Sequence, residues 1–448
     1  MATVYEKEKH LPILAETDVL VVGGGPAGLA AALASAREGV DTMLLERNGF
    51  WGGTFTQAMV ESLVWYRHEE TVEAGGIGRE LEEFATAFGG TYPDPESTGR
   101  LIDADMFKCA ADKLIEQSGV RPLFHCYAVA AIVIDGIIKG VITESKSGRQ
   151  AVLAKVVIDA TGDADIAAFA GAPYTKASAG ELMCVTTGFG VSGVDVASFR
   201  NHIAAHPGRI GDWASLTAKG EEDLFSAYFS HVFEKARKDG VIPEDSPLEG
   251  FWHSITEAGE VTGLNVVRVF DVDSTNVWDL TRAEIEGRQQ VLQALDALRL
   301  YQPGFEKAKL RTIGSSVGTR ESRKIEGRYY LTEYDVRNQA QFEDSIGIFP
   351  EFLDAYGIVI IPTTGRYFQV PYGIMVPKLV DNLLVAGRSV AGDKVSHSAT
   401  RQMICCAVTG QGAGVAAATA VKSSTCTTSA VNIGAVQTRL QKQGVRIK

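Results

Sequence analysis

The sequence lacks an uninterrupted apolar run of about 18 to 20 residues, the length that a membrane-spanning helix needs. Its opening stretch, MATVYEKEKHLPILAETD, lacks the basic region, apolar core and cleavage site of a secretory signal peptide, because acidic residues are spread through it. We therefore expect no membrane span and a cytoplasmic protein.

Paired cysteines are also missing. The six cysteines form no C-x-x-C pair and no spacing typical of metal ligands, so we expect no bound metal. Cys405 and Cys406 are neighbours in an apolar stretch, and adjacent cysteines rarely form an unstrained disulfide, which favours a packing role for both.

The chain has fewer basic residues (43) than acidic residues (55). The net charge of −12 argues against nucleic acid or an anionic membrane surface as a partner, since both attract basic proteins. A local cluster of arginines could still bind an acidic substrate. The length of 448 residues suggests two or three domains at about 150 residues each.

The sequence does contain a glycine-rich turn between an expected strand and an expected alanine-rich helix. Residues 21–36 read VVGGGPAGLAAALASA, in which Gly23, Gly25 and Gly28 form the G-x-G-x-x-G of a dinucleotide-binding fold. The first glycine permits the tight turn, the second lets a pyrophosphate approach, and the third lets helix and strand pack closely. Glu46 ends a second strand, where it could accept hydrogen bonds from ribose hydroxyls.

The two ends of the chain share one pattern of expected strands and small-residue helices, and the middle of the chain has a different pattern. An amphipathic helix over 105–118, a hairpin around Asp135-Gly136 and a strand over 151–158 continue the opening pattern. A strand over 381–386 and a small-residue helix over 410–420 return to it near the end. We expect a nucleotide-binding domain in three parts (1–66, 104–172 and 376–448), an irregular excursion (67–103) and an inserted substrate domain (173–375).

A second G-x-G-x-x-G, Gly188 to Gly193, is interpreted as a strand ending in a turn before a helix capped by Asp195. It lacks the acid-ended second strand of a dinucleotide fold. Without a second such fold, electrons would come from the substrate, from NAD(P)H docking transiently, or from a partner.

Six motifs in order resemble the FAD-dependent oxidoreductases of the glutathione-reductase structural family, in the single-chain branch. They are VVGGGPAGLAAALASA, LLERNGFWGGT, VVIDATGDADIAAFAGAP, IGSSVGTRESRKIEGRYYLTEYD, NLLVAGRSVAGD and GQGAGVAAA. The resemblance implies an α/β fold. Its Rossmann-like FAD-binding domain would be of the ββα glutathione-reductase type, and an inserted α+β substrate domain would split it. It implies noncovalent FAD as the cofactor, since no attachment motif is recognised.

The resemblance also implies roles for individual positions. The glycine turn would bind the pyrophosphate, Glu46 the adenosine ribose, and Val129 the adenine through its backbone. The helix N-terminus expected near Gln411 would approach the flavin and favour its reduced anion, although its small residues also suit close packing alone. The implied FAD-binding residues are Gly23, Gly25, Pro26, Ala27, Gly28, Glu46, Arg47, Gly52, Gly53, Thr54, Val129, Ala160, Thr161, Gly162, Gly387, Arg388, Gln411 and Gly412.

The candidates for chemistry lie in the insertion and in loops that return to the flavin. His397, in a polar loop, is the first choice for a general acid or base, with Tyr372 as a second catalytic candidate. Arg320 and Arg323 could clamp a carboxylate, or could belong to a network that ties the insertion to the FAD domain. The expected substrate-binding residues are Arg320, Arg323, Arg401, His253 and Tyr66.

Three functions remain open at this point. The first is hydride transfer between FAD and a small organic substrate, which could be a carboxylate or carry a ring, by a dehydrogenase or a reductase. The second is a monooxygenase that takes electrons from outside, and the third is a flavin-stabilised accessory or sensing subunit. External partners could be NAD(P)H, a reductase, a quinone or oxygen, and a homo-oligomer is possible.

Overall fold

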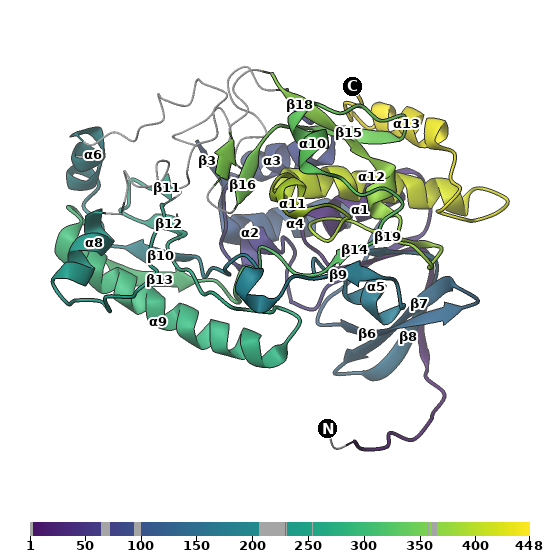
Figure 1. The fold of residues 1–448 in the computed structure, drawn as a ribbon, viewed down its shortest axis with the longest axis horizontal. Helices are drawn as coiled ribbons and strands as arrows, with labels where there is room; N and C mark the ends of the chain where they lie inside the picture. Colours follow the sequence, from purple (N-terminus) through teal and green to yellow (C-terminus); the bar gives the residue numbers. More distant parts are fainter. Residues whose placement is uncertain are drawn as a thin grey trace.

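A seven-stranded sheet forms the centre of the larger of two units (Figure 1). The structure is a computed structural model and describes residues 3–63, 72–93, 100–205, 229, 231–252, 254–355, 358–360 and 365–448. The sheet has the order β5-β2-β1-β8-β7-β6, and β19 pairs with the end of β8. Its strands are β1 (Ile13–Val22), β2 (Thr42–Leu45), β5 (Arg121–Leu123), β6 (Tyr127–Ile134), β7 (Ile137–Ser145), β8 (Gly148–Asp159) and β19 (Leu383–Val385).

The parallel strands of this sheet end at one edge. Val22 pairs with both Leu45 and Asp159, and Val385 also pairs with Asp159. Each of these residues is the last of its strand, so the loops that follow leave the sheet together. β6 and β7 form the antiparallel hairpin expected from the sequence. The α/β fold is confirmed, and its carboxyl edge is where open sheets of this kind bind ligands.

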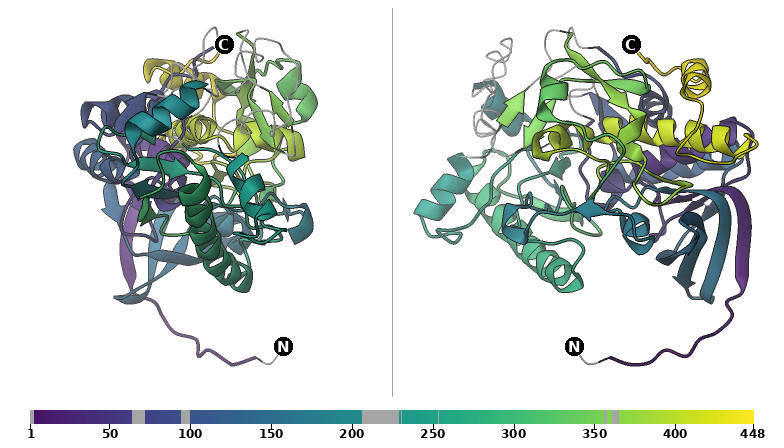
Figure 2. Two further views of the ribbon diagram at one scale, coloured as in Figure 1. Left: turned by 90° about the vertical axis from the view of Figure 1, so that its left-hand side faces the viewer. Right: turned by 45° about the vertical axis from the view of Figure 1, so that its right-hand side comes forward.

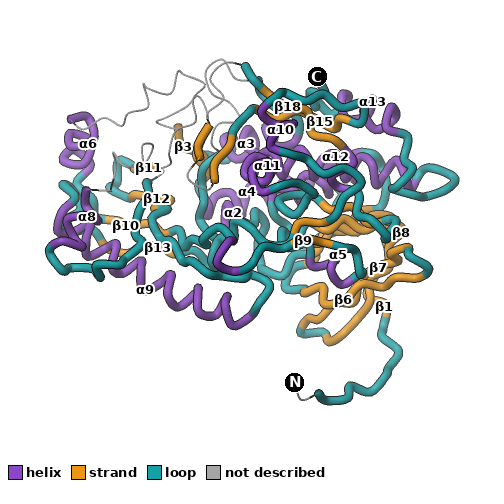
Figure 3. The backbone as a smooth tube through the Cα atoms, viewed as in Figure 1, coloured by secondary structure: helices purple, strands orange, loops and turns teal. Residues whose placement is uncertain are grey.

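Two helices, α1 (Pro26–Arg37) and α12 (Met403–Val421), pack side by side against this sheet (Figure 1), and α12 is seen near the strands of the sheet in Figure 3. A Cβ on Gly410 would lie 2.1 Å from the carbonyl oxygen of Ala27, and a Cβ on Gly414 would lie 2.3 Å from that of Ala31. Only hydrogen at these two positions allows the helices to approach this closely. The glycines of the GQGAG stretch therefore serve helix packing.

The helix α12 is uncharged, and by length and composition it is apolar enough to cross a membrane. Thr409, Gln411 and Thr419 interrupt it, so it is not an uninterrupted apolar run. In the structure 94% of its apolar window is buried inside the protein, where it packs against α1 and the sheet. The buried position of α12 in the core explains its apolar composition.

A smaller unit carries its own core and lies to the left in Figure 1, apart from the seven-stranded sheet, as the right-hand view of Figure 2 also shows. Its sheet has the order β11-β12-β10-β13. Its elements are β10 (Phe189–Ser192), α6 (Val196–Ala205), α8 (His231–Lys238), β11 (Ser254–Ile255), β12 (Val261–Leu264), α9 (Val277–Tyr301) and β13 (Lys309–Ile313). β10 ends at Ser192, directly before Gly193, and the Asp195 side chain accepts from the Ser198 N–H, which confirms the interpretation of the second G-x-G-x-x-G.

The cores divide the chain differently from the expected boundaries. The buried residues of the second core run from Val185 to Val317, whereas those from Ile325 to Val376 belong to the first core. We propose residues 185–317 as the inserted unit, in place of 173–375. The stretch expected to be irregular, 67–103, contains an 11-residue helix (Ile77–Ala87) that joins the first core.

The remaining elements surround the larger sheet. The helices are α2 (Thr54–Gln57), α3 (Ile77–Ala87), α4 (Ala104–Ser118), α5 (Asp165–Phe169), α10 (Glu333–Arg337), α11 (Lys394–Thr400) and α13 (Ile433–Lys442), with 3-10 turns at Ala179–Glu181 and Tyr372–Met375. The strands are β3 (Thr91–Pro93), β4 (Arg100–Ile102), β9 (Tyr174–Thr175), β14 (Lys324–Ile325), β15 (Ser345–Pro350), β16 (Leu353–Ala355), β17 (Ile358–Ile360) and β18 (Tyr367–Pro371).

A buried carboxyl group connects the two units. Glu61, 2% exposed, accepts a 2.7 Å hydrogen bond from the hydroxyl of Thr262 on β12. Burial and, to a smaller extent, the nearby charge of Asp103 raise the pKa of Glu61 to about 8. The hydrogen bond from the Thr262 hydroxyl acts in the opposite direction. Glu61 is therefore a neutral acid at pH 7 in the folded protein.

Glu61→Gln is expected to change how stability depends on pH. Between about pH 4.5 and pH 8 the folded wild-type protein binds a proton at Glu61 that the unfolded chain has lost. The free energy of unfolding should therefore fall as pH rises through this window, by on the order of 3 kcal/mol from this group. The glutamine variant should lack that contribution, as measured by urea titrations at pH 5 and pH 8.

Glu257→Gln is the control, because the Glu257 side chain is 82% exposed. It should keep the wild-type pH dependence. An unchanged pH dependence in Glu61→Gln would contradict the neutral assignment of Glu61.

Candidate functional site

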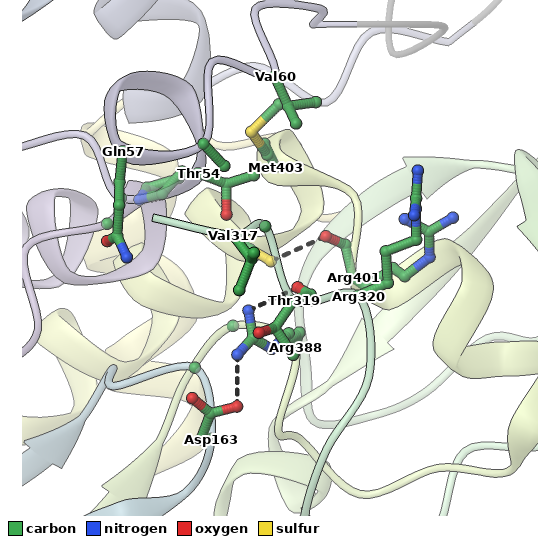
Figure 4. Close-up of a pocket in the computed structure, with 18 of the residues that line it drawn as sticks. Thr54, Gln57, Val60, Asp163, Val317, Thr319, Arg320, Arg388, Arg401 and Met403 are labelled. Atoms are coloured by element: carbon green, nitrogen blue, oxygen red, sulfur yellow. Dashed lines mark hydrogen bonds and ion pairs between the residues drawn. The ribbon is translucent and has the colours of Figure 1, made fainter. Parts of the chain in front are cut away.

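A cavity of about 740 Å³ opens at the carboxyl edge of the large sheet and reaches the second unit (Figure 4). It is lined by Val22 and Leu45 at the ends of β1 and β2, and also by Phe251 and Trp252 of the second unit. The predicted site residues that line it are Gly23, Gly25, Pro26, Ala27, Glu46, Arg47, Gly53, Thr54, Ala160, Thr161, Gly162, Arg320, Gly387, Arg388 and Arg401.

The helix α1 begins at this cavity without a side-chain cap. Its N-cap is Gly25, no acidic residue lies in its first turn, and Pro26 is the first helical residue. The unpaired N–H groups and the positive end of the helix dipole therefore remain available to an anion. This is the arrangement that a pyrophosphate requires.

The glycines of the turn divide into structural and open positions. A Cβ on Gly28 would lie 1.7 Å from the Gly23 carbonyl oxygen, so Gly28 lets the helix pack on the strand. At Gly25 an added Cβ would have one atom of the described residues beyond its chain neighbours within 4 Å, the Gly53 Cα at 3.7 Å. The space in front of Gly25 belongs to the cavity, where a side chain would occupy the ligand's place.

Glu46 supports the loops that follow β1 and β2 at one end of the cavity. Its carboxylate accepts from the Gly24 N–H at 2.7 Å and from the Asn48 N–H at 2.8 Å. Arg47 lines the same end, together with Tyr127 and Ala128 at the start of β6. Val129, expected to touch the adenine, does not line the cavity, and neither do Gly28 and Gly52.

An ion pair between Asp163 and Arg388 crosses the middle of the cavity wall (Figure 4). Arg388 Nη2 donates to Asp163 Oδ1 at 2.5 Å, and its Nη1 donates to the Thr319 carbonyl at 2.9 Å. Burial would raise the pKa of Asp163, but the charge of Arg388 and the hydrogen bonds from Ser322 and Arg388 together outweigh it and hold the pKa below its usual range. Asp163 was not among the predicted residues, although it ends the quoted DATGD motif.

Two further arginines line the cavity from the segments that follow β13 and α11. Arg401 Nη2 donates to the Asp354 carboxylate at 2.8 Å. Arg320 Nη1 donates to the Cys184 carbonyl at 2.8 Å and lies 3.2 Å from the Cys184 thiol sulfur. Cys184 and Asp354 also line the cavity and were missed by the sequence, which offers no local motif for either.

His397 and Tyr372 do not line the cavity. His397 lies on α11, is 1% exposed, and its Nε2 is 3.1 Å from the Arg320 carbonyl oxygen. Burial, together with the nearby charge of Lys324, lowers the pKa of His397 to about 3. The Tyr372 hydroxyl donates to the Thr428 carbonyl, and burial raises its pKa. Both side chains are used within the core, so neither is kept as the acid or base.

Two more predictions differ from the structure, and two residues are not tested by it. Gln411 and Gly412 lie inside α12, which begins at Met403, so the residues at its N-terminus on the cavity are Gln402 and Met403. Arg323 does not line the cavity and pairs with Asp165 at 2.8 Å, as in the network alternative. His253 and Tyr66 lie outside the described residues.

The fold and the site together define a class of protein. A parallel sheet, a G-x-G-x-x-G turn at its carboxyl edge and an uncapped helix facing a large cavity are the features of a dinucleotide-binding flavoprotein of Rossmann type. The family described as FAD dependent oxidoreductase matches residues 18–440, and the chain belongs to it. The protein is an FAD-dependent oxidoreductase, and the open space at Gly25 and the uncapped α1 fit the pyrophosphate of FAD.

Curated relatives are similar to parts of the chain. Digeranylgeranylglycerophospholipid reductase 1 of Methanopyrus kandleri is 31% identical over 156 residues, which are 33% of this chain and 40% of the relative. Thiamine thiazole synthase of Methanococcus vannielii is 32% identical over 33% of this chain and 57% of the relative. 6-Methylpretetramide 4-monooxygenase of Streptomyces rimosus is 29% identical over 51% of this chain and 60% of the relative. The chain therefore spans about half the length of these relatives.

Among solved structures, a geranylgeranyl bacteriochlorophyll reductase-like protein of Thermoplasma acidophilum has a TM-score of 0.47 and 14% identity. The match covers 96% of this chain and 82% of that one.

Proposed function

We propose that this protein transfers a hydride between FAD and a small organic substrate, as a dehydrogenase or a reductase. The observation that supports this proposal is that one cavity touches both the N-terminus of α1 and the second unit. A cofactor bound along the sheet edge and a substrate bound against the inserted unit would share one enclosed space. Hydride transfer requires that proximity.

Residues of both units have separate roles in this proposal. Gly25, Pro26 and Ala27 at the start of α1 hold the pyrophosphate, and Arg388 is fixed beside them by Asp163. When bound, FAD supplies a ring that accepts or donates a hydride. Leu101 and Phe251 give the substrate end apolar walls that exclude water. FAD is expected to be noncovalent, so acid precipitation should leave the flavin in solution.

A flavin-dependent monooxygenase is the second candidate, because one of the matched relatives is named as a monooxygenase. It would need electrons from NAD(P)H, a reductase or another external donor, with oxygen as the acceptor. An accessory or sensing role is the third. A homo-oligomer is compatible with each of these.

An anaerobic titration of the FAD-loaded protein distinguishes these functions. We expect the absorbance of the oxidised flavin to bleach with a hydride donor from a panel of small hydroxy and amino acids, or the absorbance of the reduced flavin to return with a hydride acceptor from a panel of small unsaturated acids. Free FAD mixed with the same compounds is the control and should stay oxidised.

Bleaching by NADH or NADPH alone would favour a reductase or a monooxygenase. A measurement of oxygen consumption would then distinguish these two functions. A flavin that stays oxidised with every donor and every compound would contradict the proposal and favour the accessory role.

A further inference from the structure

Arg320 differs in its partners from three other arginines of the cavity, whereas Arg47, which directly follows Glu46 after β2, lines a different part of it. Arg388 is paired with Asp163, and Arg401 is paired with Asp354. Arg268 is likewise paired with a carboxylate, at 2.8 Å, from Glu249. Arg320 has no carboxylate partner within the part of the chain that the structure describes, and it bonds only to the neutral carbonyl and thiol of Cys184.

The donors of Arg320 are only partly used. A guanidinium has five N–H donors in a planar fork. The bonds to Cys184 both involve Nη1, so Nη2 and Nε keep donors without an acceptor among the described residues. Arg320 is partly exposed and lines the cavity, so these donors can reach a ligand there. A planar fork of this kind binds carboxylate or phosphate oxygens in a bidentate manner.

The position of Arg320 is fixed at both ends. Its guanidinium is held by Cys184, and its backbone carbonyl lies 3.1 Å from Nε2 of the buried His397. The preceding backbone, Val317 to Thr319, also lines the cavity. A side chain fixed in this way loses little conformational freedom when a ligand binds, which favours affinity.

Arg320 lies at the substrate end of the cavity. Its partner Cys184 immediately precedes Val185, where the core of the second unit begins. Thr186, two residues further, donates to Asn265 at 2.7 Å, and Asn265 lines the cavity with Phe251. The pyrophosphate of FAD is assigned to the start of α1, so an anion at Arg320 belongs to a second molecule.

We propose that Arg320 binds an anionic group of the substrate, a carboxylate or a phosphate, so that the protein acts on small organic acids. This inference rests on the proposed function, because it names the substrate class of the same cavity. Arg320 is a binding residue in it, and His397 is a positioning residue that acts through the Arg320 backbone.

The test uses the FAD-loaded protein and three aromatic probes of similar shape: benzoate, phenyl phosphate and the neutral benzamide. Binding is measured by calorimetry and by the change in the flavin spectrum. We expect at least one anion to bind at least about 10-fold more tightly than benzamide, since each charge-assisted bond adds to affinity. Which anion binds more tightly tells carboxylate from phosphate.

Variants of two arginines give the matched comparison. Arg320→Met should abolish the preference for the anion, and Arg320→Lys should keep part of it, because lysine retains the charge but loses the fork. Arg311→Met makes the same change on β13, where the side chain is 66% exposed and does not line the cavity. It should bind the anions as the wild-type protein does.

The proposal is overturned if the wild-type protein binds no anion more tightly than benzamide, or if Arg320→Met keeps the preference. A lowered flavin reduction potential in Arg320→Met with unchanged anion binding would assign the arginine to the flavin instead. These outcomes are separate from the proposed function, which fails when the wild-type flavin stays oxidised with every donor, whether or not the anions bind.

Discussion

Gly25→Val is expected to remove FAD from the protein while leaving the chain folded. Gly25 has a φ of −75° and a ψ of −173°, an extended conformation that valine adopts readily. The valine side chain would extend into the cavity in front of the α1 N-terminus, where the pyrophosphate must lie. We expect FAD affinity to fall by on the order of 100-fold or more, about 2.7 kcal/mol, because the phosphates lose their contact with the helix.

The measurement is flavin content per protein after gel filtration, together with circular dichroism of the same sample. Gly28→Ala is the informative comparison, since its Cβ would lie 1.7 Å from the Gly23 carbonyl oxygen. That variant should lose stability as well as FAD. Wild-type flavin content in Gly25→Val would contradict the assignment of the pyrophosphate site.

Arg388→Met is expected to destabilise the protein strongly, even without FAD. It leaves the Asp163 carboxylate buried without its compensating charge. Removing one partner of a buried ion pair costs about 3 kcal/mol or more. In the variant, the pKa of Asp163 should rise above its usual range, so the folded state would gain a proton that the unfolded chain lacks. The loss of stability should therefore be larger at pH 8 than at pH 5.

Urea titrations of the FAD-free protein at pH 5 and pH 8 measure this loss. The double variant with Asp163→Asn should recover part of it, because the unpaired charge is gone. Arg121→Met, which breaks a surface pair with Asp41, is the control and should cost less than about 1 kcal/mol. An equal loss for Arg388→Met and Arg121→Met would show that Asp163 does not need its partner.

The features that the sequence predicted best are those that local chemistry determines. The turn places Gly23 and Gly28 where the backbone is crowded, and Gly119 caps the end of α4 in the left-handed conformation that a C-terminal glycine favours. The hairpin at Asp135-Gly136 also has both turn residues at positive φ. Each depends on residues close together in the chain, so a short pattern is enough.

The predictions that failed depend on contacts between distant segments. Gly410 to Gly414 looked like a helix start, whereas these glycines lie inside α12 because α1 passes close to them. His397 looked like a loop residue, although Asp393 caps a helix there and that helix is buried in the first core. The partners of Arg320 and Arg388 lie 136 and 225 positions away in the chain, beyond any local pattern.

The contact between α1 and α12 fixes the spacing of two electrostatic poles. Both helices begin at the cavity, neither N-terminus has a side-chain cap, and the backbones touch at Ala27 and Gly410. Because the two helices are packed in close contact, the fold sets the distance between the two poles, and a cofactor that contacts both would have to match it. The packing of small residues in the core would thereby favour a ligand of a certain length. A shorter flavin without the adenosine diphosphate portion would reach only one of the two helix N-termini.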